Sequence, residues 1–138
     1  MFPNLRFVWV TREEKARQAV SLWKALQTWT WRRDDGDGHV VHGELQYSFD
    51  AIDHLVGSIR ADEVSWHVYF AECGVVPHNV VYEDFALRYE EVVLEILDFL
   101  GIDLDQAHAF RPPQMTRQSD DLSEEWLARY SADAAARR

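Results

Sequence analysis

The residues with the clearest chemical potential lie at the first junction between a predicted strand and a predicted helix. Arg12 directly follows an apolar segment, and Ser21 lies nine residues later. Ligands of α/β proteins gather beyond the carboxyl ends of strands, where helix N-termini offer N–H groups. A long arginine side chain and a hydroxyl about two helical turns further on can bind one phosphate group. A solvated surface without any ligand is the alternative interpretation of the same two residues.

Apolar patterning predicts the elements that position these residues. The segment 6–10 is nearly all β-branched or aromatic, which indicates a buried strand, and Thr11 is expected to be the N-cap of the next helix. Apolar residues then recur at steps of three and four, so a helix should run to about Trp31. In such a helix Ser21 faces away from the apolar stripe.

The remaining elements follow the same logic of spacing and breaks. The full order, strand–helix–helix–strand–helix–helix, predicts an α/β chain that is mostly helical and has two short parallel strands. Between Leu45 and Phe70 the spacing predicts one long helix or two in close succession, closed by Gly74. A strand at Asn79–Tyr82 and a helix containing 87–100 should follow. The last helix is expected to be capped by Ser123 and to fray from Ser131.

The composition fits a single globular domain, residues 1–138. Hydrophobic residues make up 47% and charged residues 28%. The net charge of −10 repels nucleic acid and anionic lipid, so we expect neither a nucleic-acid partner nor a membrane partner. The N-terminus has no signal-peptide pattern, and a single cysteine, Cys73, cannot form an internal disulfide. We therefore expect a cytoplasmic protein.

An ordered set of short motifs runs through nearly the whole chain. Its members are Thr11-Arg12, Lys15, Gln18 to Ser21, Trp23 to Ala25, Gln27-Thr28, Trp66, Phe70, Gly74, Pro77, Val81 to Asp84, Phe99 to Gly101, Arg117 to Asp120 and Glu125-Trp126. In this order they resemble the bacterial carbohydrate sulfotransferases, the family typified by trehalose 2-sulfotransferase. The resemblance implies transfer of a sulfuryl group from 3′-phosphoadenosine 5′-phosphosulfate to a hydroxyl of a carbohydrate, with no metal ion.

The resemblance also implies roles for four residues of this chain. An arginine after a strand and a serine on the next helix hold the 3′-phosphate in the wider fold, and these roles fall on Arg12 and Ser21. Arg117 and Gln118 match the late element on the cofactor side. One departure is Glu13, which stands where a second arginine is expected. Its carboxylate weakens the local positive field.

A second departure concerns the loop that binds the phosphosulfate. The family begins with a strand and a loop resembling a P-loop, and its catalytic carboxylate lies in that early region. None of the six glycines of this sequence belongs to a Gly-rich loop followed by Lys and Ser or Thr. We therefore expect this chain to form the C-terminal part of a P-loop-like sulfotransferase fold. Its sequence assigns no catalytic residue. The alternative is a non-catalytic module that binds a partner or forms a dimer.

Three further expectations concern metal binding, thiol chemistry and assembly. His39 and His42, with Glu44 nearby, indicate a surface pair and not a metal site. Cys73 has no basic neighbour that would activate it, so a buried thiol is expected. A small sheet without further strands leaves an edge unpaired, which favours a homo-oligomer or pairing with a missing N-terminal segment.

Overall fold

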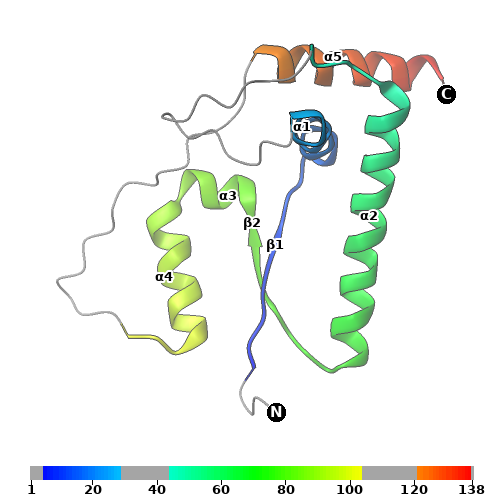
Figure 1. Cartoon of the computed structure of the whole chain (residues 1–138). Helices are drawn as coiled ribbons and strands as arrows, with labels where there is room; N and C mark the ends of the chain where they lie inside the picture. The colour runs from blue at the N-terminus through cyan, green and yellow to red at the C-terminus, as the bar shows by residue number, and fades with distance from the viewer. Residues whose placement is uncertain (1–4, 29–43, 104–120, 138) are drawn as a thin grey trace. The chain divides into compact units, whose positions relative to one another are not determined.

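The computed structural model describes residues 5–28, 44–103 and 121–137. In chain order the elements are β1 (Val8–Thr11), α1 (Lys15–Thr28), α2 (Phe49–Glu72), β2 (His78–Val81), α3 (Tyr82–Leu87), α4 (Tyr89–Leu100) and α5 (Asp121–Ala136) (Figure 1). The chain divides into two compact units. The sheet unit comprises Met1–Glu13 and Ser65–Arg117, and the helical unit comprises Glu14–Val64 and Gln118–Arg138. That residues 1–138 form one partial domain stays a prediction.

Two parallel strands form the sheet of the sheet unit. Val8 pairs with His78 and Thr11 pairs with Val81, and the His78 N–H donates a hydrogen bond of 2.8 Å to the Phe7 carbonyl. In Figure 1 the strands lie side by side, with α3 following directly from the end of β2. This confirms the predicted mostly helical α/β chain with two short parallel strands.

Aromatic residues hold the sheet unit together. Phe70 from the last turns of α2 is 5% exposed, and the rings of Phe7 and Trp9 each pack edge-on against it at 5.6 Å between centroids. Val80 of β2 and Val92 of α4 are also buried. Edge-to-face packing of this kind adds about 0.5–1.5 kcal/mol per pair beyond the burial of apolar area. The strand that ends at the candidate site is thus fixed by its aromatic side chains.

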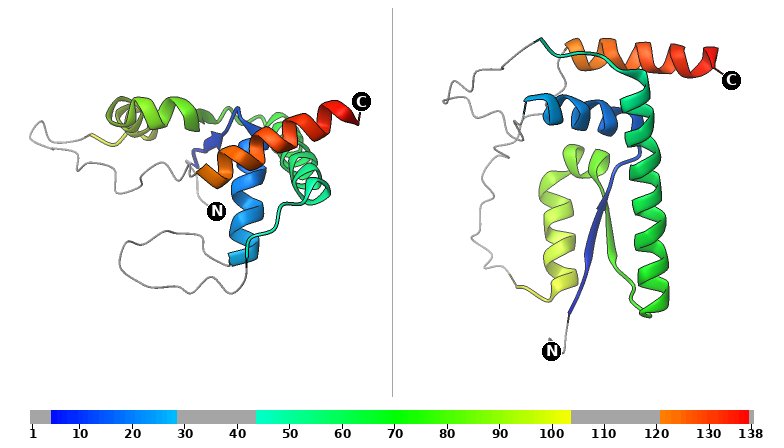
Figure 2. Two further views of the ribbon diagram at one scale, coloured as in Figure 1. Left: turned by 90° about the horizontal axis from the view of Figure 1, so that it is seen from above. Right: turned by 45° about the vertical axis from the view of Figure 1, so that its right-hand side comes forward.

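The core of the helical unit lies where α1, α2 and α5 meet. Figure 2 shows α5 passing over α1. The buried residues are Ala19, Val20, Ile52, Val56, Trp126 and Tyr130. The buried residues of α2 and of α5 lie four positions apart, and on α1 the partly buried Ala16 and Trp23 extend Ala19 and Val20 at steps of three, so one face of α1 packs in the core.

The junction between β1 and α1 differs from the sequence-based expectation. Thr11 was expected to cap the helix, but it is the last residue of β1, and its hydroxyl contacts Asn79 Oδ1 at 3.3 Å. The helix begins at Lys15, and the Gln18 N–H donates to the Glu14 carbonyl at 3.0 Å. A β-branched residue is well suited to a strand, and pairing with Val81 outweighs the capping preference. The predicted helix end near Trp31 lies outside the described residues.

The number and the bounds of the middle helices differ in part from the prediction. The stripe up to Phe70 belongs to one continuous helix, α2, but this helix begins only at Phe49, so the predicted inclusion of Leu45 is wrong. The helix ends before Gly74, whose φ is +62°. The predicted helix over 87–100 is instead two helices, because the backbone leaves helical geometry at Arg88, with φ −124° and ψ 45°. The second strand ends one residue before the predicted Tyr82, which opens α3.

The last helix is longer than expected at both ends. It begins at Asp121, so Ser123 is not its cap but a buried residue of its first turn. The fraying expected from Ser131 is also wrong, since α5 continues to Ala136. The physical reason is the run of alanines after Ala132, because alanine has the highest helix propensity.

Candidate functional site: the end of the parallel strands

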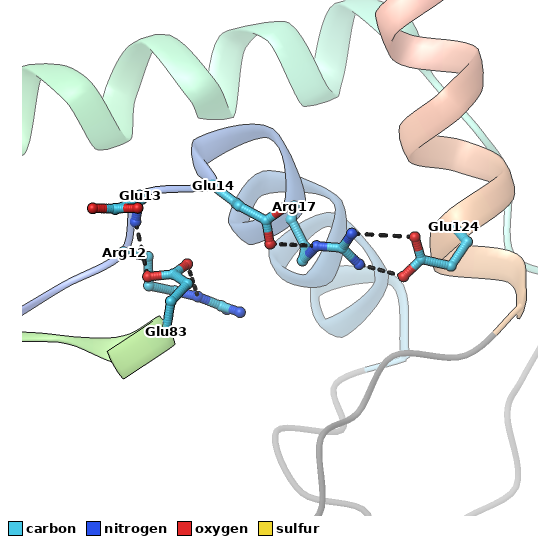
Figure 3. Close-up of polar contacts among 6 residues, drawn as sticks. All are labelled: Arg12, Glu13, Glu14, Arg17, Glu83 and Glu124. Carbon is cyan, nitrogen blue, oxygen red and sulfur yellow. Dashed lines mark hydrogen bonds and ion pairs between the residues drawn. The ribbon is translucent and has the colours of Figure 1, made fainter. Parts of the chain in front are cut away.

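Arg12 leaves the sheet where both parallel strands end. It directly follows Thr11, and because Thr11 pairs with Val81, the residues after β2 come to the same edge. The guanidinium carbon lies 4.1 Å from the ring centroid of Tyr82. The Arg12 Nε forms an ion pair of 3.9 Å with Glu83 Oε1, and Figure 3 shows these two side chains together. The Arg12 side chain is 24% exposed. It is therefore held on one face by an aromatic ring and on one edge by a carboxylate.

Glu83 also holds the backbone that follows Arg12. Its Oε2 accepts a hydrogen bond of 3.0 Å from the Glu13 N–H. Figure 3 shows the Glu13 side chain extending away from the Arg12 guanidinium. The carboxylate that meets Arg12 is thus the one from Glu83, which sequence reasoning did not single out as a site residue.

Ser21 lies on α1 in the helical unit. Its side chain is exposed, whereas Ala19 and Val20 are 0% and 1% exposed, in agreement with the predicted orientation of the helix. Arg12 belongs to the sheet unit and Ser21 to the helical unit. Their common binding of one phosphate stays a prediction.

Arg17, one turn before Ser21 on α1, is the second residue that sequence reasoning missed. Its Nε donates to Glu14 Oε2 at 2.7 Å, and its two terminal nitrogens donate to the two carboxylate oxygens of Glu124 on α5 (Figure 3). The hydrogen bond to Glu124 raises the pKa of Arg17 against the opposing effect of its burial. The Arg17 guanidinium and the Glu124 carboxylate pair with each other within the protein. Arg17 therefore orders the part of α1 next to Ser21.

A second contact ties the start of α5 to α1. Lys24 Nζ donates to Ser123 Oγ at 2.9 Å. The helix α5 follows the segment that carries Arg117 and Gln118, and both of these residues lie outside the described residues. Their predicted place beside the cofactor stays a prediction.

One of the missed contacts had a signal in the sequence. Parallel strands end at the same edge of a sheet, so an arginine after the first strand and a glutamate after the second are brought together by the topology alone. The pair Arg12 and Glu83 follows from that rule once the two strands are predicted to be parallel. The pair Arg17 and Glu124 has no such signal, because it depends on how α5 packs on α1.

The remaining candidate features concern metal binding, the single cysteine and membrane-spanning helices. Across residues 5–28, 44–103 and 121–137, no group of three or more His, Cys, Asp or Glu side chains can hold a metal ion. His39 and His42 lie outside the described residues. Cys73 is exposed and not buried as expected, because it lies at the open end of α2 just before Gly74. Among the described helices, none is long and apolar enough to span a membrane.

Comparison with known proteins identifies the relatives of this chain. It is 35% identical over 131 residues to trehalose 2-sulfotransferase of Mycobacterium tuberculosis, covering 93% of this chain and 46% of that protein. It is 37% identical over 126 residues to trehalose 2-sulfotransferase of Mycolicibacterium smegmatis, covering 91% of this chain and 45% of that protein. The chain thus spans a little under half the length of these curated relatives. Since residues 1–133 match the family described as Stf0 sulphotransferase, the chain belongs to that family, as its ordered motifs predicted.

Proposed function

We propose that this chain forms the 3′-phosphate side of an enzyme that transfers a sulfuryl group from 3′-phosphoadenosine 5′-phosphosulfate to a carbohydrate hydroxyl. The observation that carries the proposal is the identity of 35% and 37% to two trehalose 2-sulfotransferases along nearly the whole chain. The placement of Arg12 at the carboxyl end of a parallel strand supports it, because ligands of α/β folds gather there.

The proposed reaction makes one bond to sulfur and breaks another. The acceptor hydroxyl oxygen bonds to the sulfur, and the bond between sulfur and the bridging phosphate oxygen breaks. Adenosine 3′,5′-bisphosphate leaves, and the hydroxyl proton passes to a base. The part assigned to this chain is binding and orientation: the Arg12 guanidinium donates to the 3′-phosphate, and the Ser21 hydroxyl donates a further hydrogen bond.

Several features suit Arg12 to this task. Its charge is permanent, and its planar group offers N–H donors in the geometry that phosphate oxygens accept. Stacking on Tyr82 fixes the plane of the guanidinium. The nearby Glu83 lowers the local positive potential, so we expect weak binding of the bisphosphate by this chain.

Calorimetric titration with adenosine 3′,5′-bisphosphate tests the proposal. A charge-assisted contact contributes about 1.5–3 kcal/mol, so Arg12→Ala should weaken binding by about tenfold or more. Ser21→Ala removes a neutral hydrogen bond and should weaken binding by about two- to tenfold. The matched control is Arg60→Ala, which removes the same charge from an exposed position of α2.

The outcomes separate the possible functions. Binding that falls with added salt and depends on Arg12 supports the proposal. Binding unchanged in Arg12→Ala contradicts the assigned phosphate site, and no binding at all favours a non-catalytic module. We expect no sulfuryl transfer by this chain alone, since no Gly-rich donor loop occurs in its sequence.

A further inference from the structure

The Glu83 carboxylate makes two contacts at the strand ends, one with the side chain of Arg12 and one with the backbone N–H of Glu13. Oε1 lies 3.9 Å from Arg12 Nε, and Oε2 accepts the hydrogen bond of 3.0 Å from the Glu13 N–H. One acidic side chain after β2 therefore fixes both the side chain of Arg12 and the backbone that follows it. The two contacts use different oxygens and differ in kind: the contact with Arg12 Nε is an ion pair without a hydrogen bond, and the contact with the Glu13 N–H is a hydrogen bond.

Glu83 contacts one edge of the Arg12 guanidinium, and the other edge points away from Glu83. A guanidinium group has one edge that includes Nε and another formed by the two terminal nitrogens. Glu83 approaches the nitrogen Nε, and in Figure 3 the terminal nitrogens extend past its carboxylate. The ring of Tyr82 covers one face at 4.1 Å.

We infer that Glu83 is the positioning residue of Arg12: its carboxylate holds the guanidinium on Tyr82 and directs the two terminal nitrogens at the 3′-phosphate. The inference rests on the proposed function and deepens it. Arginine side chains lose much rotamer freedom when they bind a ligand, and a side chain already held in place loses less. Glu83 thus strengthens phosphate binding by fixing Arg12, although its own charge repels the phosphate.

Repulsion of the phosphate by Glu83 and positioning of Arg12 by Glu83 predict opposite effects of Glu83→Ala on ligand binding. If repulsion dominated, Glu83→Ala would bind adenosine 3′,5′-bisphosphate more tightly than the wild type. Positioning requires that Glu83→Ala bind it more weakly, by about two- to tenfold. Glu83→Gln should also weaken binding, because one of its two terminal groups is a donor and opposes either Arg12 Nε or the Glu13 N–H. Glu83→Asp keeps both acceptors and should recover part of the affinity.

A readout without ligand separates this inference from the proposed function. The Nε–H group of Arg12 gives an NMR signal, assigned by its loss in Arg12→Lys, whose order parameter reports how firmly the side chain is held. We expect the order parameter to fall in Glu83→Ala and to recover in Glu83→Asp. The matched control, Glu90→Gln, removes one charge from an exposed position of α4 in the same unit and should leave the signal unchanged.

Each result decides one of the two claims. An unchanged order parameter in Glu83→Ala overturns the positioning role, whether or not the ligand binds. Tighter binding in Glu83→Ala or Glu83→Gln overturns it as well. If the order parameter falls but the wild-type chain does not bind the bisphosphate, the positioning of Arg12 is confirmed and the proposed function is overturned.

Discussion

Arg17 and Glu124, 107 residues apart in the chain, join α1 to α5 through both terminal nitrogens of the guanidinium and both oxygens of the carboxylate. The Arg17 side chain is 18% exposed and the Glu124 side chain 50%. A two-point contact at the rim of a core is better ordered than a surface ion pair, because the planar groups fix each other's orientation. This contact orders the helix that carries Ser21.

A double-mutant cycle with Arg17→Ala and Glu124→Ala tests the strength of this contact. We expect a coupling of about 0.5–1 kcal/mol in the free energy of unfolding, since the pair is only partly shielded from solvent. Added salt should reduce the coupling. The matched control is Arg137 with Asp50, an ion pair of the same unit whose side chains are 57% and 84% exposed, and it should show no measurable coupling. Equal coupling in both pairs contradicts the ordering role of Arg17.

Two glycines should respond in opposite directions to the same substitution. Gly101 ends α4 with a φ of +71°, so Gly101→Ala should lower the free energy of unfolding by about 1–2 kcal/mol. Gly57 lies within α2, and a Cβ placed there meets no atom within 4 Å. Gly57→Ala should therefore raise the free energy of unfolding by about 0.4–1 kcal/mol. Urea unfolding of both variants checks this, and a loss of stability in Gly57→Ala contradicts it.

Tyr47 should make the stability of the helical unit depend on alkaline pH. Burial, together with the 2.8 Å hydrogen bond that its hydroxyl donates to Asp133, raises the pKa of Tyr47 to about 12 from its usual value of 10.0. A raised pKa means that the folded chain holds the proton more firmly than the unfolded chain does. The resulting stability is fully present below pH 10 and is lost as the pH rises from about 10 to about 12.

Unfolding by urea at a series of alkaline pH values, with and without Tyr47→Phe, measures this effect. Tyr47→Phe should lose about 1 kcal/mol at neutral pH and show a smaller decline above pH 10. Asp133→Asn keeps the tyrosine but removes the negative charge, and spectroscopic titration should then show a lower pKa for Tyr47. The same alkaline decline in wild type and Tyr47→Phe would show that other groups cause it.

The sequence was sufficient for the existence of the two strands and for the orientation of Ser21, because both depend on local patterns of apolar residues. The predicted bounds and burial of the first strand, 6–10, were wrong: β1 spans Val8–Thr11, none of its residues is buried, and Val10 is 59% exposed. The sequence was insufficient at Thr11 and Ser123, where good capping residues lie inside a strand and inside a helix. At Thr11, strand pairing with Val81 decides the structure, and the Ser123 hydroxyl accepts a hydrogen bond from Lys24 on another helix. Glu83 was within reach of sequence reasoning, since the parallel topology brings it to Arg12. Local propensity alone does not predict contacts between residues that are distant in the chain.

Self-association through the sheet unit is the remaining expectation. Among the described residues, β1 and β2 have only each other as hydrogen-bonded neighbours, so each leaves an outer edge open to another strand. Val10 of β1 is 59% exposed and adds apolar area at that sheet. The net charge of −10 opposes association of two copies, so screening by salt should favour it. We therefore expect the fraction of oligomer to rise with both protein and salt concentration.

Light scattering after size-exclusion chromatography measures this fraction. Val10→Lys places a charge beside the open strand and should shift the chain toward the monomer. The control is Val64→Lys on α2, because Val64 is similarly exposed, at 61%, and lies outside the sheet. Both variants change the net charge equally, so a difference between them reports on the sheet and not on charge. A wild-type monomer at every concentration and salt level contradicts self-association, and an equal shift in both variants contradicts the assignment of the interface to β1.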